Sequence, residues 1–180
     1  MKELPLSVAV CALVNDNKIL LIKRVRGDYV GLYALPGGKI EKHEHFADAA
    51  MREIEEETGI KTEFKDYLGL VSEHLVENGD IIQHFLLHFC ELIPMSKQTT
   101  NSGEGDSTWF DLEQITLQQN QIVPSDYLMI EKLLLNKGKK HYHCSIEKNG
   151  ESHTLKYFKG GKHFNQNSPE SGSFHRLSFG

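Results

Sequence analysis

The sequence predicts one domain of mixed α and β structure, an α+β or α/β fold that ends in a β-hairpin. Three observations favour this class. Short apolar runs of strand length alternate with turn residues, two segments have the apolar spacing and end signals of helices, and an Asn-Gly pair separates two strand-like segments near the C-terminal end. A chain of 180 residues is long enough to bury one core.

The first half is predicted to contain four strands and one helix. Strands are expected at residues 7–14, 18–24, 62–74 and 81–92, a glycine-rich loop at residues 31–38, and a helix at about residues 44–58. Gly59 suits the left-handed conformation that ends many helices. The turn Asn78-Gly79-Asp80 is expected to join the last two strands.

The second half is predicted to hold a short strand, a second helix and the hairpin. A polar loop is expected at residues 97–107, a strand at 108–110, a helical turn from 111–114, a helix at 126–136, and hairpin strands at 141–148 and 151–158. Pro124 precedes the helix and Gly138 ends it. Asn149-Gly150 is the strongest short hairpin signal.

One face of this hairpin is apolar. In the expected register two sets of residues share that face: Tyr142, Cys144 and Ile146 with His153, Leu155 and Tyr157. The face either extends the main sheet or meets a partner subunit, which would give a homodimer. We therefore expect a domain at residues 1–138, an appended hairpin at 139–158, and a flexible tail rich in Gly, Ser, Asn and Lys at 159–180.

Composition limits the functions that are open. The chain has 20 Lys+Arg against 25 Asp+Glu and a formal charge of -5, which argues against binding to a nucleic-acid polymer or an anionic membrane. No apolar run reaches the roughly 18 residues of a membrane span. The apolar start of the chain is explained by a strand hairpin rather than an export signal. Cys11, Cys90 and Cys144 have no metal or redox spacing, so we expect reduced thiols in a cytoplasmic protein.

The helix at residues 44–58 carries an unusual run of glutamates. Its apolar stripe is Phe46, Ala47, Ala50 and Ile54. At about 100° per residue, Glu57 falls near the middle of this stripe, Glu53 about 40° away, and Glu56 about 60° beyond Glu53. We therefore expect these three carboxylates to face partly inward.

Like charges in the last turn of a helix destabilise it, because the helix dipole is negative there. Arg52 is expected to face partly elsewhere, and one guanidinium cannot neutralise three carboxylates. A hard divalent cation can, and Mg²⁺, or alternatively Mn²⁺, suits a site made of oxygen ligands. The other interpretation is a solvated acidic face, and helical phase argues against it.

The run from Gly38 to Ile60 resembles an unbroken Nudix box, the signature of Nudix hydrolases. Gly38 is followed after five residues by Glu44, and after seven more by the sequence REIEEETGI that begins at Arg52. The preceding LPGGK and the order of strands also resemble the family, from about residue 7 to residue 135. The resemblance implies an α/β/α sandwich around a mixed sheet, and Mg²⁺-dependent hydrolysis of a nucleoside diphosphate linked to another group.

The resemblance also implies roles for single residues. The metal ligands would be Glu53, Glu56, Glu57 and the carbonyl oxygen of Gly38. Arg52 would orient a carboxylate, and Glu44 would steady the loop and the helix. A pyrophosphate is already anionic, so attack by water needs a metal to screen charge and to lower the pKa of that water. Glu53, or an acid outside the box, would act as general base.

Two positions depart from the family pattern. His43 stands where the family usually has Gly, and His45 where a small hydroxyl residue would cap the helix. A lost cap costs about 1 kcal/mol. We expect lower local stability rather than lost activity.

Candidates outside the box are weaker. Arg24 and Lys39 are the predicted phosphate-binding residues, with Arg26 less favoured, and solvated surface cations are the alternative. Glu104, in the loop before Trp109, is the predicted additional base or metal ligand, although its spacing is not the family's usual one; a solvated loop acid is the alternative. His74, His84 and His88 are expected to be sheet residues, because Mg²⁺ prefers oxygen. Tyr29, Tyr33 and Phe85 could stack on a base, with core packing as the alternative for each.

The favoured function is hydrolysis of a normal or damaged nucleoside triphosphate to the monophosphate and pyrophosphate. The alternative with the same mechanism is an ADP-ribose or nucleotide-sugar diphosphatase; the proline that marks many ADP-ribose enzymes is replaced here by His74 and Leu75. A tyrosine that marks dinucleoside polyphosphate enzymes is missing as well. An alternative of another class is a nucleotide-sensing module without turnover, which normally loses a box carboxylate, whereas this box is intact.

Overall fold

A mixed sheet organises the fold in the computed structural model, which describes residues 4–96 and 105–161. Within these residues the sheet has nine strands in the order β3-β2-β1-β6-β5-β8-β9, with β4 paired to β1 and β7 to β2. The strands are β1 (Leu6–Asn15), β2 (Lys18–Lys23), β3 (Tyr33–Ala34), β4 (Gly37–Lys39), β5 (Thr62–Glu77), β6 (Asp80–Pro94), β7 (Ser107–Asp111), β8 (His141–Asn149) and β9 (Ser152–Gly160).

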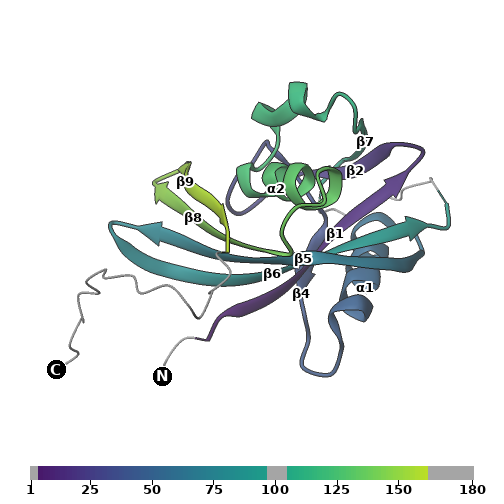
Figure 1. Cartoon of the computed structure of the whole chain (residues 1–180), viewed down its shortest axis with the longest axis horizontal. Helices are drawn as coiled ribbons and strands as arrows, with labels where there is room; N and C mark the ends of the chain where they lie inside the picture. Colours follow the sequence, from purple (N-terminus) through teal and green to yellow (C-terminus); the bar gives the residue numbers. More distant parts are fainter. Residues whose placement is uncertain (1–3, 97–104, 162–180) are drawn as a thin grey trace, which may run out of the picture.

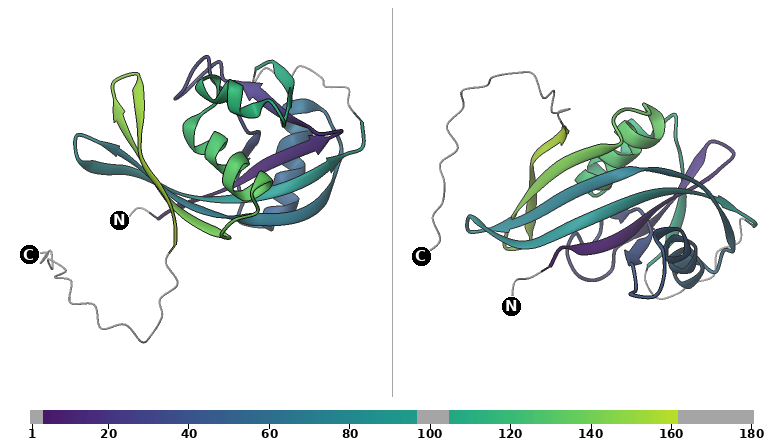
Figure 2. Two further views of the ribbon diagram at one scale, coloured as in Figure 1. Left: turned by 45° about the horizontal axis from the view of Figure 1, so that its top comes forward. Right: turned by 60° about the horizontal axis from the view of Figure 1, so that its bottom comes forward.

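Helices cover both faces of this sheet, as Figures 1 and 2 show. They are α1 (Phe46–Thr58), the 3-10 helix η1 (Ile115–Gln121), α2 (Pro124–Met129) and the π-helix η2 (Ile130–Leu135). Strand β1 pairs in parallel with β6, and β5 in parallel with β8, whereas the β5–β6 pair is antiparallel. The predicted mixed α and β fold with helices on either side of a mixed sheet is confirmed.

The alternation of β1 divides the core into two parts. Ala9, Cys11 and Leu13 pack with Ala50 and Ile54 of α1 on one face. Their neighbours along the strand join a second cluster that contains residues of β5, β6, α2, η2 and β8. Successive side chains of a strand point to opposite faces, so one strand supplies both halves of the core.

Several predicted boundaries differ from the structure. The predicted loop at residues 31–38 contains β3 and the start of β4. The second helix begins at Pro124, two residues before the predicted start, because proline suits the first position of a helix. Its continuation from Ile130 is a π-helix, which apolar periodicity does not reveal.

The hairpin of β8 and β9 extends the main sheet along β5, which is the first of the two predicted alternatives. The register predicted for this hairpin was wrong at one point. A bulge shifts the pairing from Ser145↔Tyr157 to Ile146↔Leu155, so Phe158 rather than Tyr157 packs on the core. Tyr157 is 37% exposed, and the rings of Tyr142 and Phe158 are stacked with centroids 4.9 Å apart. The extra residue of a bulge reverses the face of everything beyond it.

Two further predictions concern thiols and membranes. All three cysteines are buried and free, as predicted. No helix in residues 4–96 or 105–161 is long and apolar enough to cross a membrane. The division of the chain into a domain, an appended hairpin and a tail stays a prediction, and residues 162–180 lie outside the described part of the chain.

Candidate active site

The C-terminal half of α1 faces the glycine pair of β4. Strand β4 pairs with β1, which places Gly37 opposite Val10 and Gly38 opposite Ala9. A Cβ atom on Gly38 would collide with the carboxylate of Glu53, and one on Gly37 would collide with the carbonyl oxygen of Ala9. Both glycines are therefore needed for close approach, and the space left by Gly38 is taken by a carboxylate.

Arg52 connects most of the acidic side chains of this region. Its Nε donates to Glu44 Oε2 at 3.0 Å and its Nη2 to Glu44 Oε1 at 2.6 Å, a bidentate pair. Nη1 donates to Glu53 Oε1 at 2.7 Å and to Glu56 Oε2 at 3.1 Å. Arg52 thus faces partly toward the loop residue Glu44, as expected, but its long side chain also folds back to bond to Glu53 and Glu56.

Glu44 bonds to the loop before α1 as well as to Arg52. Its Oε1 also accepts a hydrogen bond from the backbone N–H of Glu41 at 2.8 Å, and Arg52 Nη2 donates to the carbonyl oxygen of Lys39 at 3.1 Å. The bonds from Arg52 and from the Glu41 N–H lower the pKa of Glu44 to about 2. The predicted steadying role of Glu44 agrees with these contacts.

The three predicted metal ligands differ in burial. The side chain of Glu53 is 14% exposed and Glu57 is partly buried, as helical phase predicts. Glu57 Oε2 accepts a hydrogen bond from the Gly37 N–H at 3.1 Å. Glu56 is 60% exposed, so its predicted inward orientation was wrong. It lies at the outer border of the acidic stripe, where its bond to Arg52 draws it toward Glu53.

The oxygen-rich composition of this cluster fits a divalent metal ion. Glu53, Glu56 and Glu57 supply carboxylate oxygens, the donors that Mg²⁺ and Mn²⁺ prefer. A cationic nitrogen of Arg52 already lies between Glu53 and Glu56, so positive charge is stabilised there. Within the described ranges, no three His, Cys, Asp or Glu side chains converge as a preformed metal site. The carboxylates are instead arranged around Arg52.

A small pocket of about 100 Å³ lies next to Glu57. Arg24 and Arg26 line it together with Gly37 and Glu57, so basic and acidic residues border one space. Arg24 is held by a bond from its Nε to the carbonyl oxygen of Asp28 at 2.7 Å. This is the arrangement expected for a phosphate group next to a carboxylate cluster.

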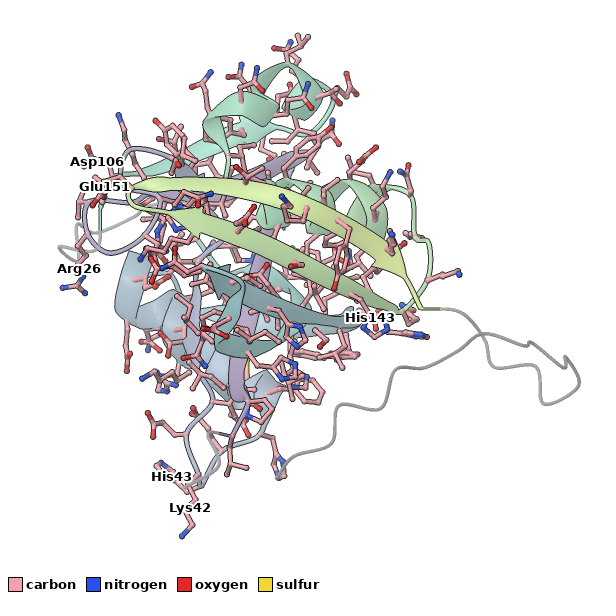
Figure 3. The ribbon with its side chains drawn as sticks, turned by 90° about the vertical axis from the view of Figure 1, so that its left-hand side faces the viewer. Arg26, Lys42, His43, Asp106, His143 and Glu151 are labelled. Atoms are coloured by element: carbon pink, nitrogen blue, oxygen red, sulfur yellow. The ribbon has the colours of Figure 1, made fainter. Side chains whose placement is uncertain are left out.

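The structure gives the other predicted site residues no side-chain contact with this pocket within the described part of the chain. Lys39 is exposed and contributes its carbonyl oxygen to Arg52 rather than its ammonium group to the pocket wall. Glu104 lies outside the described residues. Asp106 bonds through its backbone, because its carbonyl oxygen accepts from the Lys23 N–H at 3.0 Å. His43 projects from the loop before α1, well away from Arg26 (Figure 3).

A larger cavity of about 230 Å³ shares Arg24 and Gly37 with the small pocket. Tyr29 and Phe85 line it, whereas Tyr33 packs edge-on against Phe110 with ring centroids 4.8 Å apart. Its wall contains Asp28 and two acids whose pKa burial raises, Glu73 and Asp126, and sequence reasoning missed all three. The signals of Glu73 and Asp126 were weak: one charge within a half-apolar strand, and one acid in the first turn of a helix.

Burial changes the titration of Glu73 and Asp126. Burial, with a smaller contribution from the charge of Glu73, raises the pKa of Asp126 to about 7, although the bond from the Leu35 N–H and the charge of Arg24 lower it. That N–H donates to Asp126 Oδ2 at 2.8 Å. Burial also raises the pKa of Glu73. The charge of Glu73 therefore favours the protonated form of Asp126.

The sheet histidines behave largely as predicted. His84 Nε2 lies 2.9 Å from Ser72 Oγ, and His88 Nδ1 lies 3.2 Å from the Tyr67 hydroxyl. His74 packs edge-on against His84, with ring centroids 4.5 Å apart. These are structural contacts within the sheet.

Comparison with known proteins identifies the family. The NUDIX domain model matches residues 4–133. An ADP-ribose pyrophosphatase of Methanocaldococcus jannaschii is 48% identical over 67 residues, which are 37% of this chain and 40% of that protein. The uncharacterised Nudix hydrolase YvcI of Bacillus subtilis is 29% identical over 133 residues, 73% of this chain and 80% of that protein. A MutT mutator protein of Bacillus halodurans has a similar fold, with a TM-score of 0.67 at 21% identity over 86% of this chain and 96% of that chain.

The matched family consists of enzymes that act on pyrophosphate bonds and generally use divalent metal ions. The matched region covers more than half of the chain, and the chain belongs to the Nudix hydrolase family. The resemblance carried by residues 38–60 is thereby confirmed.

Proposed function

We propose that this protein is a Mg²⁺-dependent pyrophosphohydrolase that cleaves a nucleoside triphosphate, normal or damaged, to the monophosphate and pyrophosphate. The observation that carries the proposal is the continuity of three parts. The acidic end of α1 meets the glycines of β4, the pocket of Arg24 and Arg26 adjoins Glu57, and that pocket shares Arg24 and Gly37 with the larger cavity. A diphosphate bound beside Arg24 would thus lie against the carboxylates.

Each residue has a task in this proposal. Glu53, Glu56, Glu57 and the Gly38 carbonyl would hold the metal, which supplies charge screening and a water of lowered pKa. Arg52 and Glu44 keep the carboxylates in place through their bidentate pair. Arg24 binds phosphate oxygens, with Lys39 at the border of the site.

The attacking water must also lose a proton. Glu53 is the general base proposed within the box, since its carboxylate is partly buried beside Gly38. Glu104 remains the proposed base or extra ligand outside the box. Replacing each by Gln in turn and measuring turnover at saturating Mn²⁺ separates them, because the loss of the base lowers turnover even when the metal site is filled.

The substrate is proposed to be a free nucleotide rather than a nucleic-acid polymer, since the formal charge is -5. A cytoplasmic location is proposed on the three free thiols. A homodimer through the hairpin region also stays a proposal.

Two other functions remain in competition. The name of the M. jannaschii relative, 48% identical over the aligned segment, favours ADP-ribose or a nucleotide sugar as the substrate. A nucleotide sensor without turnover is the less favoured alternative, because the box keeps all of its carboxylates.

One experiment separates these alternatives. The protein is incubated with Mg²⁺ and a panel of nucleoside triphosphates, ADP-ribose and nucleotide sugars, and the released products are separated and identified. Pyrophosphate and a monophosphate from a triphosphate are the expected result. Products from ADP-ribose or a nucleotide sugar alone would favour the second function, and nucleotide binding without any hydrolysis would favour the third.

A further inference from the structure

The larger cavity has apolar walls and a small group of polar atoms. Its apolar walls come mainly from β1, β5, β6 and the segment before α2: Val8, Val10, Leu75, Phe85, Leu87 and Val123. Tyr29, Glu73 and Asp126 add the polar groups. Apolar walls with a few placed polar groups are typical of pockets that bind a small organic ligand.

Two polar atoms of this cavity lack a partner. Glu73 is 9% exposed, and its Oε2 is buried without a hydrogen bond to any described residue. The hydroxyl of Tyr29 is likewise buried and unpaired within the described part of the chain. Leaving a buried donor or acceptor unpaired costs roughly 1–3 kcal/mol, so such groups call for a functional explanation.

Glu73 and Asp126 provide hydrogen-bond acceptors in this cavity, and the Tyr29 hydroxyl provides a donor. Burial raises the pKa of Glu73, and burial together with the charge of Glu73 raises the pKa of Asp126 to about 7. The Ser125 hydroxyl and the Cys144 thiol lie beside Glu73 and partly stabilise its charge. Burial and the charge of Glu73 keep the Tyr29 hydroxyl protonated, because they raise its pKa.

Two further charged residues, Arg24 and Asp28, line the cavity beside Glu73 and Asp126. Arg24 lowers the pKa of Asp126, and Asp28 lies in the cavity wall near the loop. Arg24 also lines the small pocket beside Glu57. A nucleotide could therefore extend from the acidic pair, past Arg24, to the carboxylates of α1.

We propose that this cavity selects guanine as the base of the substrate, with the Glu73 carboxylate accepting two adjacent N–H groups and the Tyr29 hydroxyl or protonated Asp126 donating to the neighbouring oxygen. This inference rests on the proposed nucleotide hydrolysis. Guanine carries an N1–H and a 2-amino group side by side, next to O6. Adenine and cytosine place one amino group beside an acceptor, and uracil places one N–H between two oxygens. Only two adjacent donors match both oxygens of a carboxylate.

The test uses a pair of substrates that differ in one group. Hydrolysis of dGTP is compared with that of dITP, which lacks only the 2-amino group. We expect kcat/KM to favour dGTP by about tenfold or more, because a missing donor leaves a buried carboxylate oxygen unpaired. In Glu73→Gln this ratio should fall close to one, mainly through loss on dGTP. Glu77→Gln, an equivalent change on β5 outside the cavity lining, should keep the wild-type ratio.

A binding measurement separates this inference from the proposed reaction. Calorimetry compares dGMP with dIMP in the absence of metal, so no hydrolysis is needed. Tighter binding of dGMP that Glu73→Gln abolishes supports the cavity assignment even if no substrate is turned over. Equal affinity of the wild type for dGMP and dIMP, or an unchanged ratio in Glu73→Gln, overturns it. Should the variant fail to fold, the wild-type comparison alone decides.

Discussion

Arg52 determines how the acidic face of α1 is arranged. One guanidinium bonds to Glu44, Glu53 and Glu56, and it also contacts the loop through the carbonyl oxygen of Lys39. The phase of the helix predicted that Glu53 and Glu57 face inward, and this is correct. It did not predict the path of Arg52, because a long side chain can reach neighbours on either side of its own helical position.

Glu57→Gln should remove metal binding without disturbing the fold. The amide oxygen can still accept from the Gly37 N–H, which now bonds Glu57 Oε2 at 3.1 Å, but the ligand charge is lost. We expect Mn²⁺ affinity and turnover to fall by more than about 100-fold, since even outer-shell changes cost 10–100-fold. Titration calorimetry, steady-state kinetics and thermal melting measure the three quantities.

Glu55→Gln is the matched control for this change. Glu55 is exposed on the outer side of the same helix, and we expect its variant to behave like the wild type. Retained activity in Glu57→Gln would contradict the assignment of Glu57 as a ligand.

Glu44→Gln should reveal the strength of the Arg52 pair through pH. The folded-state pKa of Glu44 is about 2, below its ordinary value of 4.5, so the folded protein binds fewer protons than the unfolded chain between these values. The stabilisation by Glu44 is therefore complete above pH 4.5 and is lost as the pH falls toward 2. The free energy of unfolding of wild type and variant should differ near neutral pH and converge in acid. A difference that stays constant down to pH 2 would refute the pair's role.

Among the secondary-structure elements, α1 has a favourable C-terminal cap and an unfavourable N-cap residue. Gly59 ends the helix in the predicted left-handed conformation with φ 72°, and its N–H donates to the Glu55 carbonyl oxygen. His45 occupies the N-cap with φ -91° and ψ 162°, and it makes no side-chain cap bond within the described structure. This conformation suits a capping residue, so only the side chain is unfavourable.

His45→Ser should stabilise the protein by about 1 kcal/mol, because the hydroxyl can accept from a free N–H of the first turn. Denaturant unfolding measures the gain, and kcat should stay unchanged, since the carboxylates lie at the other end of the helix. His43→Ser, two residues earlier and exposed, provides the control. An equal gain in both variants would argue against a capping effect.

The register of β9 shows the limit of pattern reasoning at this scale. Alternation predicted that Tyr157 joins the apolar face, and a bulge placed Phe158 there. A bulge depends on how two strands pair across the sheet, and the residues of one strand do not record it. The long strands β5 and β6 were predicted more reliably, because their turn carries Asn78 and Gly79 at φ 53° and 88°.

At the scale of the whole molecule, the hairpin lies over the loop that lines the larger cavity. Lys148 Nζ is 2.9 Å and His153 Nε2 is 3.3 Å from Asp28 Oδ1. The rings of Tyr29 and His153 have centroids 4.1 Å apart. Tyr29 has φ 61°, which is unfavourable for a side chain of its size. Residues beyond the matched region 4–133 thus help to hold a wall of the cavity.

His153→Ala should weaken substrate binding more than catalysis. Without the imidazole, Tyr29 loses the contact that keeps it in a strained conformation, so we expect KM to rise several-fold with kcat nearly constant. Lys156→Ala removes a different ion pair of β9, that with Glu147 at 2.7 Å, and should leave KM unchanged. A fall in kcat at constant KM would show that the hairpin acts on the carboxylates instead.

Apolar periodicity and a contiguous motif are local properties, so they were enough to predict the mixed fold, the span of α1 and the identity of the acidic side chains. That Tyr29, Glu73 and Asp126 share one cavity follows from the folded chain alone. They come from a loop, a strand and a helix far apart in the chain, and sheet topology brings them together. Burial then changed their chemistry, and a desolvated acid of pKa about 7 at Asp126 cannot be recognised from its residue type alone.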